Sequence, residues 1–396
     1  MQKILRTAII TTGRADYGLL RPLIKKIDNS DNYELFVIAT GSHLSQIHGM
    51  TIHEIEKDGF DVHYKVEITQ KKDSEHDICN AISIGIEQFS NVYNLIKPDF
   101  IIVLGDRYEL WSVCIPAVIH KIPIVHLHGG EITSGLIDDS VRHSITKMAS
   151  YHFASINDYA KRIIQMGEDR RRVFVVGALG IDNIKSIDFM SYQELYDFTG
   201  LNFHNPIALM TFHPVTLDER KLAVKQVQSI LNSLLKFNLT TLITMPNSDP
   251  AGIIIYKEIT KYLNKNPLCF RFMESLGQKA YISAMNYATL MIGNSSSGII
   301  ESASFKIPVV NIGDRQTGRI APPNVINSTY AENDIYAAIK LALSSHFKKS
   351  ISNINNPYGN GSTAQKIEKH LNSIDFIKKD VILKKGFMDL EFIDKL

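Results

Sequence analysis

The stretch Phe-Ile-Ile-Val-Leu-Gly-Asp-Arg at residues 100–107 joins an apolar run of strand length to a glycine and two charged residues. The apolar part does not alternate with polar residues, which is typical of a strand buried on both faces of a parallel sheet. Five other runs in the first half share this pattern: residues 5–11, 33–40, 122–127, 151–155 and 173–176. Amphipathic stretches separate them, so the alternation predicts a doubly wound α/β domain.

The second half of the chain has the same architecture. Its apolar runs are residues 207–212, 240–245, 269–273, 289–292 and 308–312. The pattern weakens over residues 177–205, where we place the domain boundary. A chain of 396 residues suffices for two domains. We therefore predict two Rossmann-like domains, residues 1–180 and 181–365, and a C-terminal helix and tail, residues 366–396, that pack back on the N-terminal domain.

The composition excludes several classes of protein. A net charge of +2 gives no basic face for nucleic acid or an anionic membrane. The cysteines Cys79, Cys114 and Cys269 are far apart and form no CxxC motif, which favours a reducing compartment. We find no signal peptide and no apolar run of membrane-spanning length, so we expect a cytoplasmic protein.

Ligands of open α/β sheets bind beyond the carboxyl ends of the strands, so we examined the residues that follow each run. Gly13 and Arg14 follow the first run, where the glycine permits a tight turn and the arginine could grip a phosphate. The alternative is an arginine on the surface. Asp106 and Arg107 follow residues 100–104 and are candidates for a general base and a substrate contact. The alternative is a structural ion pair that caps the next helix.

The richest segment runs from His126 through His128 and Glu131 to Asp138 and Asp139. The spacing of these residues is not that of a zinc motif, so acid–base chemistry is the better interpretation and we predict no metal. One of the two histidines could instead be a hydrogen-bonded core residue. We expect one aspartate to cap the following helix and the other to face the ligand.

The second half offers groups for an anion. His213 follows the first run of this half and precedes a proline. Small hydroxyl residues at 293–298 precede a helix that carries Glu301, which is typical of a diphosphate cradle. The cradle lacks the lysine of a P-loop. Arg315 follows a further apolar run and supplies another cation for the same phosphates.

Eight short motifs occur in one order along the chain. They are Gly-Arg-Ala-Asp-Tyr at 13–17, Gly-Ser-His-Leu at 41–44, Gly-Asp-Arg at 105–107, Gly-Gly-Glu at 129–131, Ile-Asp-Asp-Ser-Val-Arg-His at 137–143, His-Pro-Val-Thr at 213–216, Gly-Asn-Ser-Ser-Ser-Gly at 293–298 and Gly-Asp-Arg-Gln-Thr-Gly-Arg at 313–319. Together they resemble the UDP-N-acetylglucosamine 2-epimerase family over about residues 3–373. The resemblance is closer to the hydrolysing branch, which makes free N-acetylmannosamine and UDP for sialic acid synthesis.

The resemblance implies a fold of the GT-B type, with a cleft between two Rossmann-like domains, and no cofactor. It implies that a base removes the C2 proton while UDP leaves from C1, and that water then adds to the 2-acetamidoglucal. It also implies roles for individual residues, as follows: Arg14, Arg315, Ser295 and Ser296 at the diphosphate, Glu301 at the ribose, Tyr281 and Asn247 at the base, and Asp106, Asp138 and His213 in catalysis. Pocket residues near His43 and Tyr281 would decide which sugar is bound.

One position departs from the family pattern. Many members carry a catalytic Glu where this chain has His128. Either His128 takes over the proton transfer, since histidine titrates near neutrality, or Glu131 reaches in.

Other functions stay open at the level of sequence. They are a hydrolysing 2-epimerase for another nucleotide-sugar, such as a GDP-linked or diacetamido sugar of the legionaminic acid pathway, a non-hydrolysing epimerase, a glycosyltransferase and a non-catalytic sensor. The resemblance further implies a homodimer or homotetramer.

Overall fold

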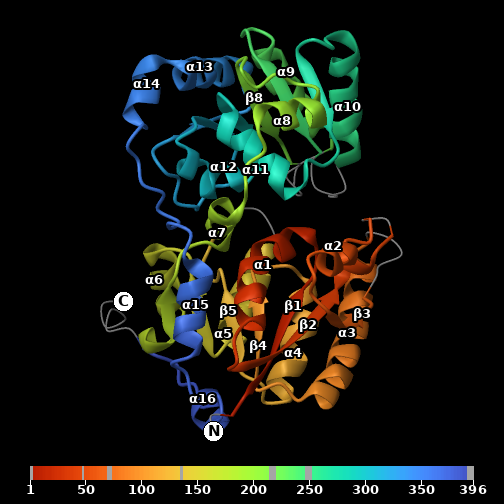
Figure 1. Cartoon of the computed structure of the whole chain (residues 1–396), viewed down its shortest axis with the longest axis vertical. Coiled ribbons are helices and arrows are strands. Elements are labelled where there is room, and N and C mark those ends of the chain that lie inside the picture. The colour runs from red at the N-terminus through yellow and green to blue at the C-terminus, as the bar shows by residue number, and fades with distance from the viewer. Residues whose placement is uncertain are drawn as a thin grey trace. The chain divides into compact units, whose positions relative to one another are not determined.

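The computed structural model describes residues 3–46, 49–68, 74–133, 137–213, 220–245 and 252–389 (Figure 1). These residues form two compact units. The first unit takes its residues from Met1–Glu131, Ile137–Asn183 and Tyr358–Leu396, and the second from Ile132–Leu136 and Ile184–Pro357. Both ends of the chain therefore belong to the first unit.

The described part of the first unit contains a seven-stranded parallel sheet with the order β3-β2-β1-β4-β5-β6-β7. Its strands are β1 (Leu5–Thr11), β2 (Tyr33–Thr40), β3 (Val62–Val66), β4 (Phe100–Leu104), β5 (Ile124–Leu127), β6 (Tyr151–Ala154) and β7 (Val173–Val175). The direction of winding reverses between β1 and β4. Ligands of doubly wound folds bind at such a switch point, where the loops after the two strands diverge.

Helices cover both faces of this sheet. They are α1 (Arg14–Asp28), α2 (Ile52–Lys57), α3 (Glu75–Ile96), α4 (Glu109–Ile119), α5 (Asp138–Met148), α6 (Asn157–Gln165), α15 (Thr363–Leu371) and α16 (Lys379–Leu383), with short 3-10 helices at Gly41–Leu44 and Arg170–Arg172. Helix α7 (Leu179–Ser186) begins in this unit and ends in the second one. One apolar core joins the sheet to α1 and α15, and the other joins it to α3, α4 and α5. Burial on both faces explains why the strands are continuously apolar.

The described part of the second unit contains a six-stranded parallel sheet with the order β10-β9-β8-β11-β12-β13. Its strands are β8 (Ile207–Thr211), β9 (Thr240–Thr244), β10 (Phe270–Met273), β11 (Leu290–Gly293), β12 (Val309–Ile312) and β13 (Val325–Ser328). Its helices are α8 (Tyr192–Thr199), α9 (Arg220–Leu234), α10 (Gly252–Lys265), α11 (Gly277–Tyr287), α12 (Ser297–Ile300), α13 (Glu332–Leu343) and α14 (Ser345–Ser350), with a 3-10 helix at Ser302–Phe305. Its switch point lies between β8 and β11.

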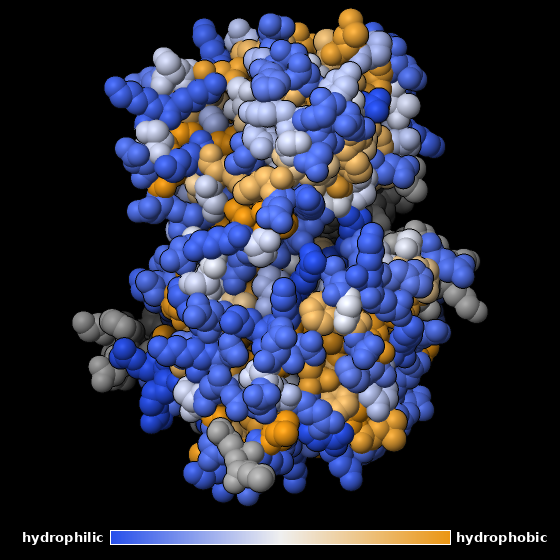
Figure 2. All heavy atoms as spheres, in the orientation of Figure 1, coloured by the Kyte–Doolittle hydropathy of each residue, from blue (hydrophilic) through white to orange (hydrophobic). Residues whose placement is uncertain are grey.

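The predicted fold class, two doubly wound parallel α/β units, is confirmed. The sequence pattern missed β3 and β13, which lie at sheet edges and are only partly buried, so they lack a continuous apolar run. The stretch 177–205, where the apolar pattern weakens, contains α7 and α8. In the residues that can be described, no helix is long and apolar enough to cross a membrane. Hydrophilic residues cover most of the face drawn in Figure 2.

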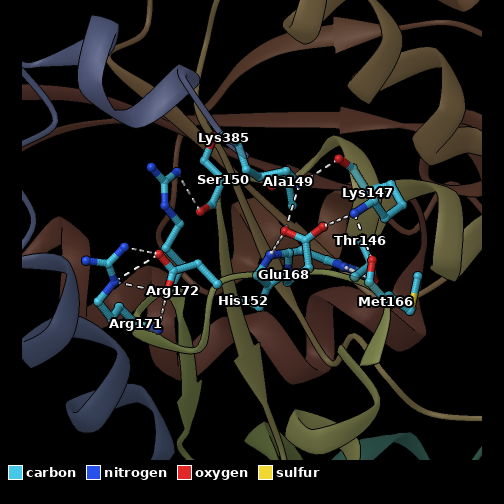
Figure 3. A network of polar contacts seen from close by, with 12 residues as sticks. Thr146, Lys147, Ala149, Ser150, His152, Met166, Glu168, Arg171, Arg172 and Lys385 are labelled. Atoms are coloured by element: carbon cyan, nitrogen blue, oxygen red, sulfur yellow. Dashed lines mark hydrogen bonds and ion pairs between the residues drawn. The ribbon is translucent and has the colours of Figure 1, made fainter. Parts of the chain in front are cut away.

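The C-terminal segment returns to the first unit. Helix α15 packs against α1, and Phe376 stacks on Phe100 of β4 with ring centroids 3.9 Å apart. Beyond α16, Lys385 Nζ donates to the backbone oxygens of Lys147 and Ala149 and lies 2.8 Å from Glu168 Oε2. Figure 3 shows this buried glutamate among its partners. These contacts hold the tail at the amino ends of β6 and β7, the edge opposite to the predicted ligand site.

Candidate active site

The loop after β1 is shaped by Asp16. Its carboxylate accepts hydrogen bonds from the backbone N–H groups of Thr12 and Gly13, at 2.6 and 2.7 Å, and so closes the start of α1. Arg14 is the first residue of α1, is 41% exposed and pairs with Glu54 at 3.2 Å. Its guanidinium therefore lies at the carboxyl edge of the sheet and is accessible to an anion.

His43 lies beside this loop and is completely buried. Its two ring nitrogens are 2.9 Å from the hydroxyls of Thr11 and Thr51. Burial lowers the pKa of His43, which keeps the ring neutral. Both ring nitrogens are therefore engaged by threonine hydroxyls within the protein.

Asp106, after β4, pairs with Arg142 of α5, which the sequence analysis did not single out. The guanidinium of Arg142 is 1% exposed and also pairs with Asp139. It donates to the backbone oxygen of Glu131 at 2.9 Å. The carboxylates of Asp106 and Asp139 stay about a quarter exposed, at 26% and 27%. One buried cation thus orients two carboxylates and a loop at the carboxyl edge.

Arg107 does not pair with Asp106 in the ion pair that the sequence analysis considered. It contacts Glu109 at 3.0 Å instead, and the charge of Glu109 raises the pKa of Arg107. The guanidinium remains 49% exposed, so it lies within reach of a ligand at this edge.

The two histidines of the segment after β5 have different environments. His126 is fully buried and donates from Nε2 to the backbone oxygen of Gly105 at 2.8 Å. Burial lowers the pKa of His126 to about 3, so it is the hydrogen-bonded core histidine of the pair. His128 lies at the strand end, where its Nδ1 is 3.3 Å from Oε1 of the buried Glu131.

The predicted helix cap at α5 is wrong. The N-cap residue is Ile137 rather than either aspartate, and its side chain makes no capping hydrogen bond. Asp138 and Asp139 both lie in the first turn, where their charges favour the positive end of the helix. Asp139 pairs with Arg142, which lies three positions later on the same helix face, a spacing that a helix brings together.

In the second unit, His213 follows β8 and Asn294 follows β11, on the two sides of the switch point. The Asn294 amide accepts from the backbone N–H of His213 at 2.7 Å and donates to its backbone oxygen at 2.8 Å. Burial and the nearby charge of Arg315 lower the pKa of His213 to about 3. The imidazole is therefore neutral near pH 7. Arg315 itself donates to the backbone oxygen of Asn294 at 3.1 Å.

The predicted diphosphate cradle is a compact network of hydroxyl groups. The hydroxyl of Ser297 is 3.0 Å from that of Ser295 and 2.6 Å from that of Tyr281, while Ser296 precedes the short helix α12. Gly293 has φ 132°, and a Cβ there would lie 1.9 Å from the backbone oxygen of Thr211, so only glycine fits.

The remaining candidates lie around this network or outside the described residues. Glu301 follows α12. The burial of Tyr281 raises the pKa of its hydroxyl, and the nearby charge of Glu301 raises it further. Asn247 and residues 214–216 of the His-Pro-Val-Thr motif fall outside the described part of the chain.

The family model described as UDP-N-acetylglucosamine 2-epimerase matches residues 25–372. The chain belongs to this family. A hydrolysing GDP/UDP-N,N'-diacetylbacillosamine 2-epimerase of Campylobacter jejuni is 40% identical over 97% of this chain and 99% of that protein. The polysialic acid biosynthesis protein P7 of Escherichia coli is 35% identical over 90% of both.

The fold is similar to that in a crystal structure of UDP-GlcNAc 2-epimerase from Neisseria meningitidis bound to UDP-GlcNAc. The match includes 93% of the present chain and 100% of the Neisseria chain, with a TM-score of 0.83. At 18% sequence identity this similarity concerns the fold alone. The two parallel-sheet units of the epimerase have the GT-B fold.

Each of the two units therefore gathers its own set of polar groups. The first unit has carboxylates and arginines at the carboxyl ends of β1, β4 and β5, which suits proton transfer. The second has hydroxyls, a neutral histidine and an arginine at the carboxyl ends of β8, β11 and β12, which suits an anion. Among the described residues no group of three or more His, Cys, Asp or Glu side chains is arranged to hold a metal ion.

Proposed function

We propose that this epimerase is a hydrolysing 2-epimerase whose substrate is a nucleotide-linked N,N'-diacetylbacillosamine. The observation that carries the proposal is the 40% identity, along 97% of the chain, to the Campylobacter jejuni protein that bears this name. The polar groups of the first unit's carboxyl edge support the chemistry that such an enzyme performs.

The reaction has two steps. A base takes the proton from C2 of the sugar while the bond from C1 to the nucleotide diphosphate breaks, and the electron pair left at C2 forms a C1–C2 double bond. Water then adds its oxygen to C1, and an acid returns a proton to C2 on the opposite face. The net change is nucleotide-sugar plus water to free 2-epimer plus nucleotide diphosphate.

Proton transfer in this scheme belongs to Asp106, Glu131 and Asp138. Paired carboxylates in unlike environments divide the roles of acid and base. Glu131 is buried, whereas Asp106 is partly exposed and held by Arg142, so the two differ in their surroundings.

Departure of the diphosphate leaves new negative charge on its oxygens. Fixed cations and hydrogen-bond donors lower the barrier of such a step. Arg14, Arg315, Ser295 and Ser296 are the donors that we assign to the diphosphate, and Tyr281 and Glu301 to the nucleoside. His213 stays neutral near pH 7 and so can donate its N–H to the leaving oxygen without carrying charge.

UDP-GlcNAc, the substrate predicted from sequence, becomes the second candidate. The 35% identity to a polysialic acid biosynthesis protein favours it, because that pathway would use free N-acetylmannosamine. The two sugars differ at C4, where one carries an acetamido group and the other a hydroxyl, and at C6, where the diacetamido sugar lacks the hydroxyl.

A proton NMR time course in heavy water, without added metal, tests the proposal. UDP- and GDP-linked diacetylbacillosamine and UDP-GlcNAc are supplied in separate tubes. We expect release of the free 2-epimer, with deuterium at C2, to be fastest from a diacetamido substrate. Faster turnover of UDP-GlcNAc would support the second candidate, and a nucleotide-linked product from every tube would contradict hydrolysis.

The cytoplasmic location and the homodimer or homotetramer remain predictions. Light scattering on the purified protein measures the second directly.

A further inference from the structure

His128 occupies an unusual backbone position at the end of β5. Its φ is 61°, in the left-handed region that is uncommon for residues other than glycine, although asparagine, aspartate and histidine adopt it more often than the rest. The backbone N–H of His128 donates to the backbone oxygen of Phe153 at 3.0 Å, which attaches the end of β5 to the neighbouring strand β6. Its side chain is only 11% exposed. The fold therefore holds the imidazole in one place at some conformational cost.

The two ring nitrogens of His128 face different groups. The backbone N–H of Leu179, at the start of α7, points at Nε2 from 3.4 Å. A backbone amide keeps its proton, so Nε2 must supply the lone pair and cannot be protonated in this arrangement. The ring proton then belongs to Nδ1, which lies 3.3 Å from Glu131 Oε1. At this distance Nδ1 is within hydrogen-bonding reach of the Glu131 carboxylate.

We propose that His128 is a positioning residue, which presents a neutral Nδ1–H to the Glu131 carboxylate and leaves proton transfer to Glu131. The inference rests on the proposed function. The lone pair of Nε2 is directed at a backbone amide rather than at a ligand, which makes the ring unsuitable as the base. The histidine at position 128, where many family members carry Glu, then changes how the Glu131 carboxylate is oriented.

Two other charged side chains lie near this turn, and both donate to its backbone. Arg142 of α5 donates to the backbone oxygen of Glu131, and Arg162 of α6 donates to that of Gly130. Both arginines hold the backbone of the loop. The buried neighbour His126 is neutral, because burial lowers its pKa to about 3.

A matched pair of substitutions separates the two ring nitrogens. In His128→Asn the amide nitrogen falls near the position of Nδ1, and asparagine tolerates a positive φ. In His128→Gln the amide oxygen can still accept from Leu179, but the donor toward Glu131 is lost. We expect His128→Asn to keep kcat within about tenfold, and His128→Gln to lower it by about tenfold to a hundredfold, the range for loss of an orienting hydrogen bond.

The pH profile gives a readout that a general loss of packing would not change. Loss of a donor to a carboxylate disfavours its charged form, so the acidic limb of kcat/KM should move to higher pH in His128→Gln and stay in place in His128→Asn. If both variants lose C2 exchange equally, with the acidic limb removed in both, His128 is itself the acid or base and the proposal is wrong.

Nitrogen-15 NMR of the histidine side chains tests the proposal without turnover, so its outcome is independent of the proposed function. The resonances of His128 are assigned by their absence from the two variants. We expect a neutral ring protonated at Nδ1 near pH 7. A ring protonated at Nε2, or a charged ring, would overturn the proposal even if the substrate assignment is right.

Discussion

The first unit contains two ion-pair clusters with opposite arrangements. At the amino ends of the strands, the carboxylate of Glu168 is completely buried, while Lys147 and Lys385 are 39% and 17% exposed (Figure 3). At the carboxyl ends, the guanidinium of Arg142 is buried, while the carboxylates of Asp106 and Asp139 are partly exposed. The anion is buried in the Glu168 cluster, whereas the anions are partly exposed to solvent in the Arg142 cluster.

The difference indicates what each cluster can do. Glu168 also accepts from the buried His152 at 3.0 Å, so its oxygens are used within the protein and fasten the C-terminal tail. The carboxylates of the other cluster share one cation and stay about a quarter exposed, so a ligand can reach them. We therefore expect the Glu168 cluster to contribute to stability and the Arg142 cluster to contribute to chemistry on a substrate.

The largest expected effect lies at the open cluster. Asp106→Asn should lower turnover by about 10²–10⁴-fold, the usual contribution of a positioned acid or base. UDP affinity should stay within about tenfold, or ~1.4 kcal/mol. Steady-state kinetics measure turnover, and calorimetric titration measures UDP affinity. Arg315→Ala is the reciprocal control, because it should weaken UDP binding. If Asp106→Asn loses UDP binding instead, Asp106 is structural.

The closed cluster should respond in stability rather than activity. Glu168→Gln leaves two lysines and a buried histidine without their carboxylate, and we expect a loss of about 3 kcal/mol in unfolding free energy. Urea unfolding followed by the fluorescence of Trp111, the single tryptophan, reports on the first unit. Asp158→Asn removes an exposed pair with Lys161 and should change stability by less than about 1 kcal/mol. Reduced turnover of folded Glu168→Gln would contradict the contrast between the clusters.

The smallest expected effect is in pH dependence. Burial alone would raise the pKa of Glu168, but hydrogen bonds from His152, Lys147 and Lys385 bring it to about 2. A carboxyl whose folded pKa is depressed stabilises the fold above its unfolded value of 4.5, and the contribution is lost as pH falls toward 2. The stability gap between the wild type and Glu168→Gln should therefore shrink over this range. A constant gap would mean that charge at Glu168 contributes little.

The strand pattern was predictable because burial on both faces demands continuous apolar residues. The runs at 5–11, 33–40 and 100–104 coincide with β1, β2 and β4. The edge strands β3 and β13 were missed, since they alternate or stay partly exposed. The helices at 177–205 are short and carry no long periodic pattern.

The candidate site was predictable only in outline. Parallel strands bring their carboxyl ends to one edge, so the loops after β1, β4 and β5 could be grouped from sequence. Arg142 was missed because its partner Asp106 is 36 positions away. Only its spacing of three from Asp139 gave a local signal. The roles of the individual side chains in catalysis remain predictions.

The path of the chain has a consequence for synthesis on the ribosome. Leu371, Phe376 and Ile382 belong to the core that packs on one face of the first sheet, yet residues 184–357 of the other unit are translated before them. At common elongation rates this delay lasts on the order of ten seconds. During that time the nascent first unit has an incomplete apolar face, where a chaperone could bind. The second unit meets no such delay, because it is continuous in sequence apart from a short segment made earlier.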